Sequence, residues 1–210
     1  MYKIIQSRFI RFFLATVTLL TIFIMLPIYT AMALPYGTGK YGTCTYNTCG
    51  ITLTSSNNIS VGVTPSDGTG DCSINNDSVS VLTGSSTGYT LTLSTNSTST
   101  SLSNGTSNIT AGTGTYSSPT ALGINQWGYR VDGVGGFGPG PTSSISNTAY
   151  PISAVFAGAV ANNVPATTIV TSSVAANPAV TTNVWYGVCA NSSLSTGLYT
   201  GQILYSAVTN

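Results

Sequence analysis

The sequence contains neither histidine nor glutamate, and only 4% of its 210 residues are charged. Without histidine, no Ser-His-Asp or Cys-His catalytic arrangement can form. Paired carboxylates for glycoside hydrolysis would have to come from four aspartates. After the N-terminal segment the only cations are Lys40 and Arg130, too few for the basic groove that nucleic acid requires. We therefore expect neither an enzyme nor a nucleic-acid-binding protein.

The low charge does not indicate disorder, because disordered chains usually combine few apolar residues with high net charge. Here hydrophobic residues make up 42% of the chain. They are spaced between serine, threonine, asparagine and glycine, which is typical of β-strands joined by neutral loops.

The N-terminal residues 1–33 have the pattern of a secretory signal peptide. Basic residues come first, an apolar run follows over 12–28, and Ala31-Met32-Ala33 then offers a cleavage site. The alternative is an uncleaved membrane anchor, although the run is slightly short for the ~20 residues of a span. We expect the general secretory route to deliver the protein outside the cell or to its surface. Any membrane contact would be made by this segment.

The four cysteines are an even number, which in an exported chain suggests two disulfides. Cys44 and Cys49 are close enough for a local loop, which would leave Cys72 and Cys189 as a long-range pair. Three pairings are possible, and the sequence does not decide among them. A metal site is the alternative, but paired Cys-x-x-Cys spacing and histidine are both missing.

Strand signals recur at short intervals from residue 51 onward. Apolar and polar residues alternate over 51–54, 59–63, 79–81, 89–93 and 127–132. Period-two patterns bounded by turn residues predict half-buried strands. Loops are expected elsewhere, in the Ser/Thr/Asn/Gly tract 94–118 and the Gly/Pro segment 133–141.

The last part of the chain is apolar on both faces of its predicted strands. Segments 180–190 and 197–208 have this pattern, which places them in the middle of a packed structure or at a contact surface, and their spacing predicts an antiparallel pair. Many short strands with turns between them indicate a sandwich or a barrel. We expect residues 51–210 to form one all-β domain, an antiparallel β-sandwich with Greek-key or immunoglobulin-like connections, after the N-terminal signal helix.

A calcium loop is the one cofactor site that the sequence suggests. Asp67, Asp71, Asn75 and Asp77 lie in a segment that is predicted to be a loop, and Ca²⁺ binds carboxylate, amide and carbonyl oxygens. The spacing differs from that of an EF-hand. Aspartate, asparagine and glycine are also ordinary turn residues, so a plain turn is the alternative interpretation. No other cofactor is expected.

The aromatic residues divide into two groups. Tyr36, Tyr41 and Tyr46 lie in the arm 34–50, with little around them to form a core, so they are the predicted contact residues. The aromatic residues in predicted strands are expected in the core; they are Trp127, Tyr129, Trp185, Tyr186, Tyr199 and Tyr205. Arg130 and Asp132, on one strand face, are expected to form an exposed ion pair worth under about 1 kcal/mol.

Four segments carry a resemblance to a known group of proteins. Gln126–Asp132, Val184–Val188, Leu194–Thr200 and Leu204–Thr209 are similar to the Trp-Gly-Tyr strand and the closing Tyr-Gly / Ser-x-Gly-x-Tyr-Thr hairpin of uncharacterised exported β-sandwich surface proteins from very small surface-dwelling bacteria. The resemblance implies a secreted or cell-surface domain with an adhesive role. It brings no catalytic residues.

The sequence thus predicts a structural or adhesive surface protein that acts by contact. Its partners would be the cell wall, a glycan, another cell or copies of itself. One alternative is a carbohydrate-binding module, which needs coplanar aromatic residues on an exposed face. A second is a pilin-like polymerising subunit that uses strand addition, with the arm 34–50 as donor.

Overall fold

A computed structural model describes residues 50–56, 58–65 and 68–210, and this part of the chain is all-β. It contains no helix, and so none that is long and apolar enough to cross a membrane. The strands are β1 (Ile51–Thr54), β2 (Asp71–Thr83), β3 (Tyr89–Thr95), β4 (Leu102–Ser103), β5 (Asn108–Ala111), β6 (Thr120–Ala121), β7 (Gln126–Val131), β8 (Ile145–Ala149), β9 (Val155–Phe156), β10 (Thr167–Ser172), β11 (Ala176–Ala190) and β12 (Ile203–Thr209).

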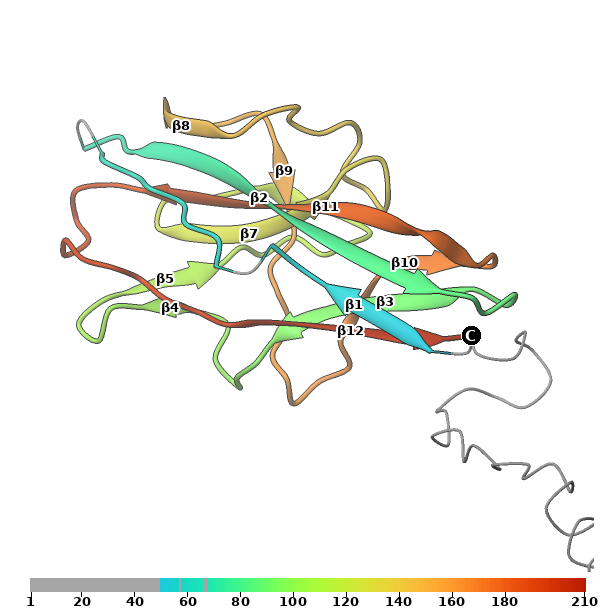
Figure 1. Cartoon of the computed structure of the whole chain (residues 1–210). Helices are drawn as coiled ribbons and strands as arrows, with labels where there is room; N and C mark the ends of the chain where they lie inside the picture. The colour runs from blue at the N-terminus through green and yellow to red at the C-terminus, as the bar shows by residue number, and fades with distance from the viewer. Residues whose placement is uncertain (1–49, 57, 66–67) are drawn as a thin grey trace, which may run out of the picture. The chain divides into compact units, whose positions relative to one another are not determined.

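Two packed sheets and a separate two-stranded pair make up the domain (Figure 1). The main sheet has the order β1-β2-β11-β7-β5-β4, with β8 also paired to β2, and the small sheet has the order β10-β3-β12. All these pairs are antiparallel except β5 with β7, and a further antiparallel pair joins β6 and β9. The predicted all-β fold is therefore confirmed, and the arrangement is that of a β-sandwich.

The main core lies between the two sheets. Strands β2 and β11 form a long ribbon in the main sheet, paired from Asp71 with Ala190 to Thr83 with Ala176. Alternate residues of the main sheet point toward the small sheet and are buried there. Among them are Val79, Val81, Tyr129 and Val184, which share one cluster with Leu91, Leu93 and Ile169 of the small sheet.

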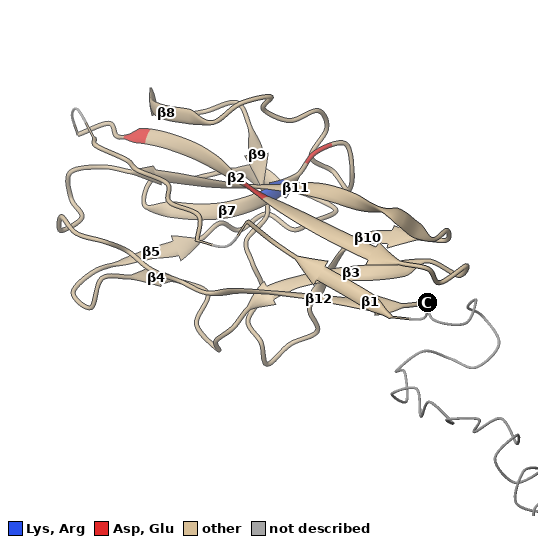
Figure 2. Cartoon of the chain, in the orientation of Figure 1, with Lys and Arg blue, Asp and Glu red and all other residues tan. Residues whose placement is uncertain are grey.

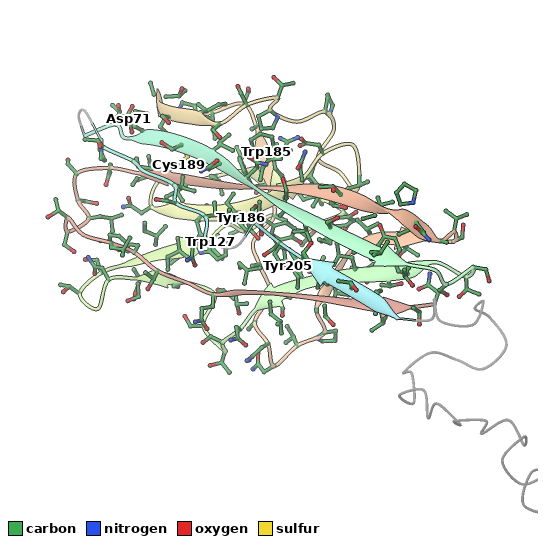
Figure 3. The ribbon with its side chains drawn as sticks, viewed as in Figure 1. Asp71, Trp127, Trp185, Tyr186, Cys189 and Tyr205 are labelled. Carbon is green, nitrogen blue, oxygen red and sulfur yellow. A yellow bond between two sulfur atoms is a disulfide. The ribbon has the colours of Figure 1, made fainter. Side chains whose placement is uncertain are left out.

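A second, smaller core covers the opposite face of the main sheet. Trp185 and Tyr186 are neighbours on β11 that belong to different cores, and Figure 3 shows both. The second core consists of Cys72, Ile74, Leu122, Ile152, Phe156, Trp185 and Cys189. β11 is buried on both faces from Val184 to Ala190, which explains the apolar residues on both faces of this part, whereas Val180 is 45% exposed.

The structure corrects three predictions about strands. The segment 59–63 is not part of a sheet, although its apolar residues do pack on the main core. In the segment 197–208 the strand begins only at Ile203, and it pairs with β3 of the small sheet, so the predicted pair with 180–190 is wrong. The tract 94–118 contains β4 and β5.

Candidate functional site

The charged side chains of the described residues are almost entirely covered. They are Asp71, Asp77, Arg130 and Asp132. The first three are buried, and the side chain of Asp132 is 31% exposed. Figure 2 colours the charged residues, and few of them appear in the described part of the chain. The described surface therefore consists of uncharged groups, chiefly hydroxyls, amides and small apolar side chains.

Arg130 does not form the exposed ion pair that the sequence predicted. Its side chain is only 3% exposed, because the segment 133–141 folds back over it. The guanidinium donates to Asp132 Oδ1 at 3.3 Å and to the carbonyl oxygens of Phe137 at 3.1 Å and Pro139 at 2.9 Å. The Trp185 indole N–H donates to the other Asp132 oxygen at 2.6 Å. Arg130 thus holds the Gly/Pro loop in place.

Asp77 is the centre of a buried polar group in the main core. The backbone N–H and the hydroxyl of Ser56 donate to its Oδ1 at 2.9 and 2.6 Å. The hydroxyls of Tyr186 and Tyr205 lie 2.6 Å apart nearby. Burial is the main cause that raises the pKa of both phenols above the usual value of 10, and the Asp77 carboxylate acts in the same direction. Asp77 and Tyr186 are buried, Tyr205 is half-buried, and Ser56 closes the group at the surface.

The connections at one end of the sandwich form a fixed polar surface. Strand registers place the start of β2 beside the end of β11, and the end of β11 beside the start of β7. The loops next to these strand ends therefore meet. We call this surface the loop end; it consists of residues 68–70, 104–107, 123–125 and 191–200.

One half of the loop end is organised by two asparagines. The Asn191 N–H donates to Asn125 Oδ1 at 3.1 Å, and Asn125 Nδ2 donates to Ser193 Oγ at 3.2 Å. Asn191 Nδ2 also reaches the carbonyl oxygen of Gly68 at 3.5 Å. Asn125 has a φ of 58°, a left-handed conformation that asparagine tolerates better than most residues. Three separate connections are joined in this way.

Ser195 organises the other half. Its hydroxyl accepts from Asn104 Nδ2 at 3.1 Å and lies 2.8 Å from the hydroxyl of Ser107. Its carbonyl oxygen accepts from the Tyr199 hydroxyl at 2.8 Å. Between these anchored positions Leu198 is 79% exposed, the most exposed large apolar side chain in the described part of the chain. The loop end thus presents hydroxyl and amide groups around one projecting leucine.

The predicted long-range disulfide is present. Cys72 and Cys189 are directly opposite each other on β2 and β11, with their Cα atoms 4.1 Å apart. Both are fully buried in the second core. Cys44 and Cys49 lie outside the described residues.

The predicted calcium loop is not a loop from Asp71 onward. Asp71, Asn75 and Asp77 belong to β2, where a rise of about 3.3 Å per residue separates Asp71 from Asp77 by about 20 Å. One ion cannot bind both carboxylates. In the described residues there is also no group of three His, Cys, Asp or Glu side chains that could hold a metal. Asp67 lies outside them.

The predicted contact residues Tyr36, Tyr41 and Tyr46 lie outside the described part of the chain. Of the aromatic residues expected in the core, Trp127, Tyr129, Trp185 and Tyr186 are buried, while Tyr199 and Tyr205 are half-buried. Within residues 50–56, 58–65 and 68–210 no aromatic side chain is fully exposed. The aromatic side chains of this part of the chain are all buried or half-buried.

Sequence analysis did not single out the loop end. Its residues are ordinary turn formers such as Asn104-Gly105 and Asn191-Ser192, and they come from distant parts of the chain. Only the strand order brings them together. The one hint in the sequence is that asparagine or serine residues flank several of the predicted strands.

No protein-family model, curated protein or solved structure matches this chain. Its function must therefore be inferred from its own residues.

Proposed function

We propose that this chain is an exported cell-surface protein that acts by contact, and that the loop end is its contact site. The main support is a network of hydrogen bonds between uncharged groups, which fixes four loops around the exposed Leu198. A surface that is already ordered loses less conformational entropy when it binds. Serine, asparagine and tyrosine are also the residues that supply hydrogen bonds in protein-binding loops.

The position of the loop end supports this role. The chain enters the domain at Ile51, which pairs with Thr83 at one end of β2. The loop end adjoins Asp71 at the other end, about 40 Å away at 3.3 Å per residue. The loop end and Ile51 therefore lie at opposite ends of β2.

The disulfide and the surface composition support a place outside the cell. Disulfides persist in oxidising compartments and are rare in the cytosol, and Cys72–Cys189 joins the two central strands. Intact mass, with and without reduction, tests export directly. We expect a mature chain that starts at Leu34. A full-length mass confined to the membrane fraction would contradict cleavage.

A matched pair of variants tests the contact site. Leu198→Ser removes the projecting side chain of the loop end, and Val174→Ser removes a 65% exposed side chain that lies between β10 and β11, outside the loop end. Labelled mature protein is titrated onto isolated cell envelopes and intact cells of the producing organism. We expect Leu198→Ser to bind at least about tenfold more weakly, a loss of about 1.4 kcal/mol, and Val174→Ser to bind like the wild type.

Salt dependence gives a second readout. Because no charged side chain projects from the loop end, binding should change less than about twofold between about 0.05 and 0.5 M NaCl. Equal binding of wild type and Leu198→Ser would exclude the loop end as the contact site. A steep fall with salt would assign contact to charged groups elsewhere.

A further inference from the structure

The turn between β4 and β5 contains a pair of residues that can react with each other in water. Asn104-Gly105 is the only place in the whole chain where glycine follows asparagine. In such a pair the glycine nitrogen can attack the asparagine side-chain amide, because glycine has no Cβ to obstruct the approach. Gly105 is exposed, and a Cβ placed there would meet nothing within 4 Å beyond its chain neighbours. Water therefore has free access to this peptide bond.

The Asn104 amide is held by its own turn. Its Oδ1 accepts from the backbone N–H groups of Thr106 at 2.9 Å and Ser107 at 2.7 Å. Two such donors stabilise the negative charge that develops on a carbonyl oxygen when a nucleophile adds to its carbon atom. They also order the side chain against the turn backbone, which lowers the entropy cost of reaching a reactive arrangement. The amide is thus activated as an electrophile.

The two nitrogen atoms that take part each have a hydroxyl partner. The Gly105 N–H donates to Ser103 Oγ at 3.1 Å, and Asn104 Nδ2 donates to Ser195 Oγ at 3.1 Å. Ser195 Oγ in turn lies 2.8 Å from Ser107 Oγ. The nitrogen that must lose a proton and the nitrogen that must gain one are therefore both next to a group that exchanges protons with water.

We propose that Asn104 deamidates by itself in the folded protein. The Gly105 nitrogen gives up its proton and bonds to Asn104 Cγ, the Cγ–Nδ2 bond breaks, and the departing nitrogen takes up a proton and leaves as ammonia. Water then opens the five-membered imide ring at one of its two carbonyl carbons. Opening at Cγ gives aspartate, and opening at the main-chain carbonyl carbon gives isoaspartate. Water is the only co-reactant.

Both products change the loop end. Its residues are all uncharged, and either product adds one carboxylate. Neither product retains the Nδ2 group that donates to Ser195. In aspartate the second oxygen can accept from the Ser195 hydroxyl instead, whereas in isoaspartate the former side-chain carbonyl belongs to the main chain and this link is lost. The modification therefore adds charge to the loop end and, in isoaspartate, separates the β4–β5 turn from the segment 191–200.

The rate in the folded protein tests the proposal. The purified protein is aged at mildly alkaline pH, where the nitrogen loses its proton more readily, beside a blocked synthetic peptide of residues 100–109. Intact mass detects the small gain that accompanies the exchange of NH₂ for OH, and peptide mapping locates it. We expect Asn104 to be the first asparagine converted, at a rate equal to or above that of the peptide. Slower conversion in the folded protein, or conversion that begins at another asparagine, would overturn the proposal.

Gly105→Ala provides the matched variant, because its methyl group obstructs the attacking nitrogen. We expect the variant to convert at least about tenfold more slowly than the wild type, and equal rates would overturn the proposal. Gly105 has a φ of 85°, which alanine adopts with strain, so circular dichroism checks the fold. The comparison of wild type with peptide needs no variant and holds even if Gly105→Ala does not fold. These measurements also need no binding partner, so their outcome is independent of the proposed contact role.

Discussion

Gly128 and Gly187 lie directly opposite each other on β7 and β11, and Phe156 packs against both. A Cβ atom on Gly187 would lie 2.5 Å from Phe156 Cζ, and one on Gly128 would lie 3.0 Å from Phe156 Cβ. The paired glycines therefore leave a flat area of backbone on which the second core is built. This gives a physical reason for glycine in both the Trp-Gly-Tyr and the Tyr-Gly segments.

Gly187→Ala should destabilise the domain, because the new methyl group overlaps the Phe156 ring and the second core is closely packed. We expect a loss of about 1–3 kcal/mol in the free energy of unfolding, measured with urea. Gly62→Ala is the matched control, since a Cβ there meets nothing within 4 Å. If both variants had wild-type stability, the close packing over the glycine pair would be disproved.

Arg130→Met should loosen the loop 133–141. The substitution removes the donors to Phe137 and Pro139 and leaves Asp132 without its cation. Because a partly buried charge and two carbonyl groups lose their partner, we expect about 3 kcal/mol less stability in urea. The stability of Arg130→Lys should lie between those of the wild type and Arg130→Met, since one ammonium group cannot span the carboxylate and the carbonyls. Wild-type stability in Arg130→Met would contradict the role of Arg130 in holding the loop.

Alkaline pH should destabilise the fold above pH 10. Below that pH the phenols of Tyr186 and Tyr205 are neutral in both states. Above it the unfolded chain releases protons that the fold retains, because the pKa of both groups is raised in the folded state. Unfolding therefore becomes easier, by up to about 1.4 kcal/mol per pH unit for each group. Urea unfolding from pH 8 to 11 measures this slope.

A tyrosine variant shows whether this pair is responsible for the alkaline slope. Tyr205→Phe removes one titrating group, so the free energy of unfolding should fall less steeply with pH than in the wild type. An identical slope in both proteins would show that the loss comes from other groups.

The disulfide should contribute to stability because it joins positions 117 residues apart. Replacing both partners in the double variant C72A/C189A should lower the free energy of unfolding by about 2–5 kcal/mol. Reduction of the unfolded wild type, followed by a second urea titration under reducing conditions, should give a similar loss. Equal stability of the oxidised and reduced protein would show that strand pairing brings the two cysteines together and that the disulfide adds no stability of its own.

The sequence predicted strands well where burial alternates on a single face. Segment 51–54 coincides with β1, 89–93 lies within β3, and 127–132 is shifted by one residue from β7. The prediction from the sequence failed at 59–63, where apolar and polar residues alternate in the same way. There the chain is held by side chains, with Asn75 Nδ2 donating to the Ser60 carbonyl oxygen, and not by a strand ladder. Alternation reports which residues are buried, and it does not report which backbone groups are paired.

The partner of the last strand could not be predicted from pattern alone. β11 and β12 follow each other closely in sequence, and this led to the prediction of an antiparallel pair. In the structure β11 already has neighbours on both sides, β2 and β7, so β12 crosses to the small sheet and pairs with β3. The loop end arises from the same topology, because distant loops meet only once the order of the strands is set.

The burial of Arg130 also bears on how long the protein lasts among extracellular proteases. It is the only lysine or arginine after Lys40 in the whole sequence, and in the fold its backbone is paired within β7 and its side chain lies under the loop 133–141. Proteases of the trypsin type cleave after basic residues, so the folded domain offers them no accessible site. Its persistence outside the cell would then depend on how rarely it unfolds, and a single cut after Arg130 would record each such event.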